Sequence, residues 1–295
     1  MIMSRLRERY GMGSIVLCLM LSSAGCVSIP RSTAVDSSAE AMRILNRSAE
    51  AHGVAALQKR HDVNVRFEGK WEPLIGRIQP ALVDDRFRGT SEERYLIHEA
   101  AVGQRHEGPG GLKQVFRYGS GVKVWYNGKA TDDEFAVHAA ALVADAYRMF
   151  LFGPQFFLER SAAVQYLGVD AVDGRECDQL LAVLRPGIGL SVEDRVIISI
   201  DRKQCWVRRV RMTVDGLAST RGAIVDVFLR DHARIGGVVW PTSFYETLKR
   251  PFPLPVHRWR LTGIDFDRNY AAETIQGPKF TGAAVRAAGT DASGE

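Results

Sequence analysis

Cysteine, net charge and long apolar runs are all scarce in this sequence. Four of its 295 residues are cysteine, too few for the dense disulfides that hold a small secreted scaffold together. The formal net charge of +5 is a mild excess, and without a basic patch it does not favour a nucleic-acid partner. The one continuous stretch of apolar or small residues, 14–25, is shorter than the about 20 residues that span a bilayer. Disulfide scaffolds, nucleic-acid binders and polytopic membrane proteins are therefore disfavoured.

The composition that remains is that of a folded chain. Apolar residues make up 46% and charged residues 25% of the sequence, which is typical of a globular protein with a sizeable core. No internal repeat and no linker divides residues 37–270. We therefore expect one domain over 37–270.

The N-terminus has the pattern of a bacterial export signal. Three arginines within residues 5–9 precede a short apolar run over 14–21, as in a signal peptide. Ser22-Ser23-Ala24-Gly25-Cys26 then resembles the lipobox of bacterial lipoproteins, in which the cysteine is acylated and the peptide before it is removed; Ser23 departs from the usual leucine. We predict a signal peptide over 1–25 and lipidation of Cys26. The alternatives are an ordinary signal peptide cut nearby and an uncut membrane anchor.

Removal of residues 1–25 changes the totals and leaves few free thiols. The mature chain would have net charge +3, and besides Cys26 it would keep Cys177 and Cys205. Strand pairing places those two about 9.6 Å apart, beyond the about 7 Å that a disulfide bridges, so we expect free thiols. An aspartate directly after the lipidated cysteine would resemble an inner-membrane retention signal, but here Val27 follows Cys26. We therefore expect a cell-envelope protein anchored in the outer membrane and facing the periplasm.

Helical and strand patterns alternate along the mature chain. Residues 26–36 are small and polar, a tether, and Ser37 with Glu40 forms a capping box that opens a helix to about residue 59. Alternation over 63–67 predicts a strand, and further strands are expected at 86–88, 95–99, 113–118 and 122–126. Thr131 with Glu134 predicts a second helix start, and that helix runs to Phe152 with an end that is apolar all round.

The last third predicts an antiparallel meander. Strand patterns cover 177–184, 192–200, 204–214, 223–229, 238–248 and 256–266 with short connections, which make successive strands antiparallel neighbours. Several of these strands are apolar on both faces, whereas an antiparallel sheet usually keeps one wet face. We expect a covered sheet or an apolar cavity in an α+β fold. Residues 271–295 are rich in small residues, and we expect a disordered tail there.

Motifs of catalysis are missing from the sequence. It has no Gly-x-Ser-x-Gly, His-Glu-x-x-His, phosphate-binding loop or Cys-x-x-Cys, and its histidines have no metal-ligand spacing on a helix. We expect neither an enzyme nor a cofactor nor a metal. An exported hydrolase stays as the least favoured alternative, and a Ser or Asp beside His232 or His257 in a cleft would support it.

The order of short motifs resembles a known family. They are 50–53 (Glu-Ala-His-Gly), 67–69 (Phe-Glu-Gly), 124–128 (Val-Trp-Tyr-Asn-Gly), 173–174 (Asp-Gly), 200–202 (Ile-Asp-Arg) and 236–242 (Gly-Gly-x-x-Trp-Pro-Thr). Together they resemble the outer-membrane lipoprotein-sorting, LolA-like family of bacterial envelope proteins. The resemblance implies an unclosed antiparallel β-barrel with helices in or over its concave face. It also implies an apolar cavity for acyl chains or other hydrophobic ligands.

The alternating faces supply candidate ligand-binding residues. Phe150, Phe152 and Phe157 are expected to form a helical lid, and the sheet wall is expected to use Leu180, Leu184, Ile198, Trp206, Val210 and Met212. The alternative for each is an ordinary packed core. The predicted function is binding or transfer of a lipid, a lipoprotein acyl chain or a similar ligand; the alternative is a protein-interaction module, such as a stress sensor or assembly scaffold. An open cavity would favour the first, and a filled core with an exposed apolar edge the second.

Overall fold

A computed structural model describes residues 28–30 and 36–280, so the predicted lipidation site Cys26 and the signal peptide lie outside the described residues. Thirteen strands form one sheet in the order β6-β5-β4-β3-β2-β1-β15-β14-β11-β10-β9-β8-β7, and every neighbouring pair is antiparallel. A separate pair, β12 with β13, makes a small second sheet. The strands are β1 (Asp62–Trp71), β2 (Thr90–Leu96), β3 (Ala101–Gly108), β4 (Gly111–Tyr118), β5 (Gly121–Tyr126), β6 (Lys129–Thr131), β7 (Ser161–Val172), β8 (Arg175–Leu184), β9 (Asp194–Asp201), β10 (Val207–Thr213), β11 (Ile224–Arg230), β12 (Ala233–Ile235), β13 (Val238–Trp240), β14 (Ser243–Arg250) and β15 (Leu254–Phe266).

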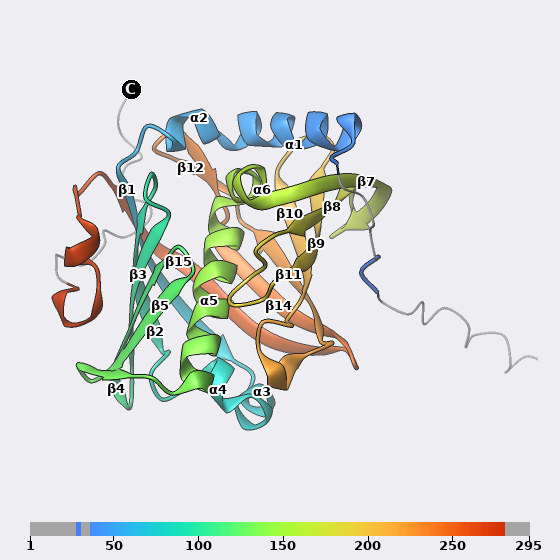
Figure 1. Cartoon of the computed structure of the whole chain (residues 1–295). Coiled ribbons are helices and arrows are strands. Elements are labelled where there is room, and N and C mark those ends of the chain that lie inside the picture. The colour runs from blue at the N-terminus through green and yellow to red at the C-terminus, as the bar shows by residue number, and fades with distance from the viewer. Residues whose placement is uncertain (1–27, 31–35, 281–295) are drawn as a thin grey trace, which may run out of the picture.

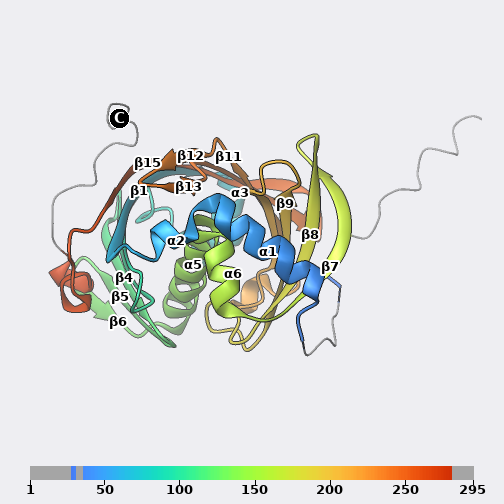
Figure 2. The same ribbon diagram turned by 90° about the horizontal axis from the view of Figure 1, so that it is seen from above.

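The helices lie on the concave side of this sheet. They are α1 (Ala39–His52), α2 (Val54–Leu57), α3 (Pro73–Ile78), α4 (Pro80–Val83), α5 (Glu134–Phe152) and α6 (Pro154–Arg160). The sheet curls around α5 and α6, and α1 and α2 cross one open end (Figures 1 and 2). The edge strands β6 and β7 do not pair with each other in the described part of the chain, so the barrel stays unclosed. The predicted fold class, an α+β curled antiparallel sheet with helices in its concavity, is confirmed.

Several predicted boundaries shift in the structure for local reasons. The side chain of Ser38, not Ser37, caps α1, and Asp133, not Thr131, caps α5 by accepting from the amide of Ala136 at 2.8 Å. The expected strand over 238–248 is divided into β13 and β14 at Pro241, whose nitrogen cannot donate to a ladder. Residues 86–88 form a turn before β2 instead of the expected strand.

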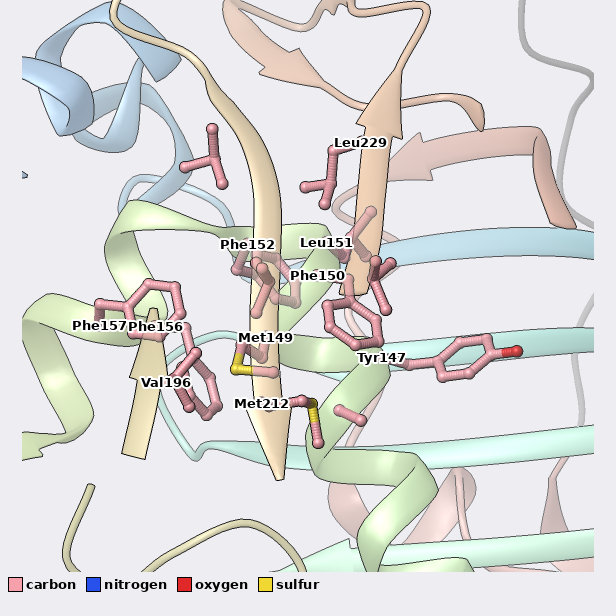
Figure 3. Packing of buried hydrophobic residues seen from close by; sticks show 14 of the residues in the cluster. Tyr147, Met149, Phe150, Leu151, Phe152, Phe156, Phe157, Val196, Met212 and Leu229 are labelled. Carbon is pink, nitrogen blue, oxygen red and sulfur yellow. The ribbon is translucent and has the colours of Figure 1, made fainter. Parts of the chain in front are cut away.

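The core surrounds helix α5. Thirteen of its 19 residues are buried, and Met149, Phe150 and Phe152 pack with Phe156 and Phe157 of α6 against the strands (Figure 3). By length and hydropathy α5 could cross a membrane, but 67% of its most apolar window is buried inside the protein. An all-round apolar helix is stable in water only when it is enclosed, and the curled sheet provides that enclosure.

A buried ion pair attaches α5 to the sheet. Arg117 of β4 donates to both carboxylate oxygens of Asp145 at 3.2 and 3.0 Å. The same carboxylate accepts from the amide of Gly189 at 2.9 Å, and Arg117 also donates to the carbonyl of Gly189. Helix, sheet and the loop after β8 are therefore held at one point.

The segment after β15 covers the convex face, which corrects the expected tail boundary. Ile275 is fully buried and packs with Phe280 against Leu96, Ala101 and Phe116. This close packing needs Gly103, since a Cβ there would lie 2.0 Å from the carbonyl oxygen of Ile275. Residues 271–280 are thus packed through a few apolar side chains in an otherwise small-residue segment, and residues 281–295 lie outside the described residues.

Candidate functional site

An exposed concavity with an apolar surface lies at the start of α5. It is a groove of about 520 Å³ between the first turns of α5 and two loops, 188–192 and 215–221. We call it the seam groove. It is lined by Glu134, Phe135, His138, Leu190, Ser191, Val192, Asp215, Gly216, Leu217, Ala218 and Arg221. Its volume falls in the range of about 300–1,000 Å³ that is usual for small-molecule sites.

Three side chains give the seam groove its apolar character. Val192 is 87% exposed, Phe135 50% and Leu190 40%. Phe135 comes from α5, Leu190 and Val192 come from the loop at 188–192, and all three line the same groove. Single exposed apolar residues are ordinary, but a group of them in a concave site indicates a contact surface for an apolar partner.

The two loops take their positions from close backbone packing. Gly189 has φ +67°, and a Cβ there would lie 2.9 Å from the Leu142 backbone, so only glycine allows the loop to approach α5. The second loop is fixed by Thr220, whose hydroxyl donates to the carbonyls of Val214 and Leu217. The groove is therefore a preformed feature whose floor rests on the core through Leu217.

Polar groups stand around the apolar part of the groove. Glu134 and His138 lie one helical turn apart, with 3.8 Å between His138 Nε2 and a Glu134 oxygen. Asp215 accepts from the amide of Gly222. Arg221 is exposed and forms no ion pair with any residue in 28–30 or 36–280. The groove thus combines an apolar surface with one free cation at its rim, which suits an amphiphile.

The structure brings most of the predicted ligand-binding residues together in the core. Eight of the nine lie in one buried cluster: Phe150, Phe152, Phe157, Leu180, Leu184, Ile198, Val210 and Met212. Trp206 lies outside that cluster and stacks on His232, with 5.2 Å between ring centroids. The eight side chains pack against one another and against α5 and α6, so the interior is filled by the protein's own residues. Their role in binding stays a prediction.

The structure bears on two further expectations, the free cysteines and the alternative of a hydrolase site at His232 or His257. Cys177 and Cys205 are both free, as expected, and burial raises the pKa of Cys177 to about 11. His232 contacts the Val207 carbonyl and Arg208; burial, followed by the charge of Arg208, lowers its pKa to about 3. No Ser or Asp hydrogen-bonds His232 or His257 among the described residues. The arrangement does not support a hydrolase at either histidine.

Sequence reasoning missed the seam groove. Phe135 fits the apolar stripe of its helix, and Val192 fits the start of a strand, so both patterns indicate burial. Phe135 and Val192 are exposed because of how the loops 188–192 and 215–221 lie beside the start of α5, which is a tertiary property. The available signal is the pair of glycine-containing loops around 187–189 and 216, which sequence patterns alone do not bring together.

Comparisons with known proteins give similar folds at low identity. No protein-family model and no curated protein sequence matches the chain. Among solved structures it is similar to a DUF1329 family protein from Desulfovibrio piger (12% identity, 82% of this chain and 98% of that chain, TM-score 0.49). It is also similar to the LolA superfamily protein NE2245 from Nitrosomonas europaea (10%, 80% and 97%, TM-score 0.45). A third is an outer membrane lipoprotein-sorting protein domain from Vibrio parahaemolyticus (8%, 80% and 96%, TM-score 0.39).

These similarities concern the arrangement of the chain. The architecture that the sequence resemblance to LolA-like proteins implies, an unclosed antiparallel barrel with helices in its concavity, is the one observed. The class that the fold and site define is an unclosed antiparallel barrel, wrapped around an apolar helix, with an apolar groove at its seam.

Proposed function

We propose that the protein is a lipid-anchored protein of the cell envelope that binds the apolar chain of a lipid or a lipid-modified protein in the seam groove. The observation that carries this proposal is the group of exposed apolar side chains, Phe135, Leu190 and Val192, in a preformed concavity. The anchor at Cys26 and the outer-membrane location come from the sequence pattern.

The groove can supply enough free energy for such binding. Full burial of one of these side chains contributes about 1.5–3 kcal/mol, so covering the exposed parts of three gives roughly 3–4 kcal/mol. Each ligand methylene that leaves water adds about 0.8 kcal/mol. A chain of eight to ten methylenes can therefore reach micromolar affinity after the costs of association are met.

We propose that the ligand binds in the seam groove and not in the interior, because the protein's own side chains fill the interior. An acyl chain among Phe150, Leu180 and Met212 would have to displace α5 or α6. The Arg117–Asp145 pair opposes such a displacement of α5. Binding at the groove needs no rearrangement of the core.

The test is titration of the anchor-free protein with a fluorescent fatty acid. Val192→Asp and Leu190→Asp each place a charge in the groove and are expected to weaken binding at least ten-fold. The matched control is Val169→Asp, since Val169 is also an exposed valine (49%) but lies on β7 and does not line the groove. Equal affinity in the groove variants and the control would contradict the proposal.

A second candidate is favoured by the same filled interior. The edge strand β7 exposes Leu167 and Val169. Residues 36–38 hydrogen-bond to Val164 and Gln165 of this strand, and the rest of its edge can accept a strand of another protein. A filled core with an exposed apolar edge is what a protein-interaction module predicts. A photo-crosslinker at residue 169 in cells would capture a discrete protein partner under this hypothesis, and one at residue 192 would capture lipid under the first.

A further inference from the structure

A second, smaller pocket lies on the concave face, between the ends of β1, β2 and β15 and helix α5. Its free volume is about 20 Å³, room for about one water-sized atom. Its buried polar lining consists of Arg88, Ser91, His106, Tyr147 and His257, and Trp71 forms one wall. Thr90 and the exposed Glu68, which pairs with Arg66 at 3.2 Å, also line the pocket. Ser91 and His106 are opposite each other in the β2–β3 ladder. We call it the Arg88 pocket.

The central observation is a buried guanidinium without a counter-ion. Arg88 is 8% exposed, yet no carboxylate of residues 28–30 and 36–280 lies within ion-pair distance of it. Two hydrogen bonds are made by its Nη atoms, to the carbonyl of Leu82 at 2.8 Å and to the hydroxyl of Tyr147 at 3.3 Å. A guanidinium has five N–H donors, and buried arginines are almost always paired with an anion.

Glu93 and Glu246, two carboxyl groups that interact electrostatically with Arg88, are poor substitutes for a counter-ion. Burial raises the pKa of Glu93 and raises that of Glu246 to about 7, and the positive charge of Arg88 only partly opposes this. Glu93 is already engaged by the hydroxyls of Tyr95 and Ser91. Neither carboxyl forms an ion pair with Arg88, so neither of them neutralises the charge of the guanidinium.

The remaining walls suit a flat, negatively charged group. Trp71 stacks on His257 with 3.8 Å between ring centroids, and the guanidinium lies over Trp71 at 5.0 Å. Burial, followed by the charge of Arg88, lowers the pKa of His106 and of His257 well below the usual value. Both imidazoles are thus neutral at pH 7, and each retains one N–H donor. Tyr147 keeps its hydroxyl proton because burial raises its pKa.

We propose that the Arg88 pocket binds a carboxylate, with Arg88 supplying the positive charge and His106, His257 and Ser91 supplying neutral polar contacts. A carboxylate is planar and matches the fork of a guanidinium. The small free volume accepts the oxygen end of a carboxylate and not the four oxygens of a phosphate. The carboxylate can be the head of a fatty acid or a short free acid. This inference does not depend on the seam groove.

The test compares acids with and without a chain. Acetate, octanoate and octanol are titrated into the anchor-free protein by calorimetry, with Arg88→Gln as the variant. The matched control is Arg86→Gln, an exposed arginine two residues earlier that does not line the pocket. In the Val192→Asp background, where the seam groove no longer takes an apolar chain, saturable binding of octanoate but not of octanol is expected. Arg88→Gln should weaken it at least ten-fold, and Arg86→Gln should not change it.

Each outcome has a definite meaning. Acetate that binds and competes with octanoate identifies a short acid as sufficient, whereas octanoate alone identifies a fatty-acid head. In that background, equal binding of octanoate and octanol, equal binding with and without Arg88→Gln, or no saturable binding of either acid overturns the proposal. If Arg88→Gln does not fold, Arg88→Lys replaces it: it keeps the charge but not the fork, and unchanged affinity there also overturns the proposal. Val192→Asp in the seam groove should leave acetate binding unchanged, which separates the two sites.

Discussion

Asp145→Ala tests how α5 is held in the barrel. The carboxylate of Asp145 and the guanidinium of Arg117 are both buried and joined by two hydrogen bonds. Removing one partner of such a pair leaves the other charge buried and uncompensated, which costs about 3–5 kcal/mol. The amide of Gly189 also loses its acceptor. We therefore expect Asp145→Ala to lower the free energy of unfolding by about 3–5 kcal/mol.

The assay is urea denaturation followed by circular dichroism, with slopes compared to verify two-state unfolding. Replacing both partners, by Arg117→Met with Asp145→Leu, should recover most of the loss, because two apolar side chains leave no buried charge. The matched control is Glu40→Ala, which breaks the exposed Glu40–Arg43 pair and should cost at most about 0.5 kcal/mol. A loss in Asp145→Ala as small as in Glu40→Ala would refute the reasoning. The seam groove should bind more weakly in Asp145→Ala, since the loop at Gly189 loses one of the two hydrogen bonds that attach it to the Arg117–Asp145 pair.

Three further predictions concern other parts of the chain. Glu246→Gln should stabilise the protein at pH 8 and leave its stability unchanged at pH 4. Burial raises the pKa of Glu246 to about 7 in the folded state, so the wild-type protein loses roughly 1–3 kcal/mol of stability as the pH rises from about 4.5 to 7. Denaturant midpoints at both pH values measure this effect, and a loss of stability in Glu246→Gln at pH 8 would contradict it. Gly103→Ala should detach the segment around Ile275, since the new Cβ would overlap the Ile275 carbonyl oxygen. Faster amide hydrogen exchange over 270–280 with unchanged exchange in the core is the expected result. Unchanged exchange over 270–280 would show that this contact does not hold the segment. Cys26→Ala should move the protein from the membrane to the soluble fraction on cell fractionation, and continued membrane retention would argue against lipidation at Cys26.

The general architecture could be predicted because its signals are local. Alternation along β1 and the short connections of the last third indicate an antiparallel sheet, and the apolar end of α5 indicates enclosure. The capping residues shifted by one or two positions because neighbouring Ser and Asp side chains can serve equally well as caps. Burial of eight of the nine chosen residues followed from the same periodicity.

The sites could not be predicted because they depend on tertiary placement. Val192 is exposed in a loop before a buried strand, and Arg88 is buried in a turn where arginine usually meets solvent. The local sequence around Val192 equally fits a buried strand residue, and the local sequence around Arg88 equally fits an exposed arginine. The packing of Ile275 on Gly103 joins segments 172 positions apart in the chain, and no composition rule distinguishes that segment from a free tail.

The most direct test of the central claim is lipid analysis of the protein itself. The anchor-free protein is purified from cells without detergent, and its extract is examined by mass spectrometry beside those of Val192→Asp and Val169→Asp. An apolar-chain ligand that co-purifies with wild type and with Val169→Asp, and is depleted in Val192→Asp, is the predicted result. Equal amounts of lipid in all three proteins, or no lipid together with no uptake of a fluorescent fatty acid, would contradict it.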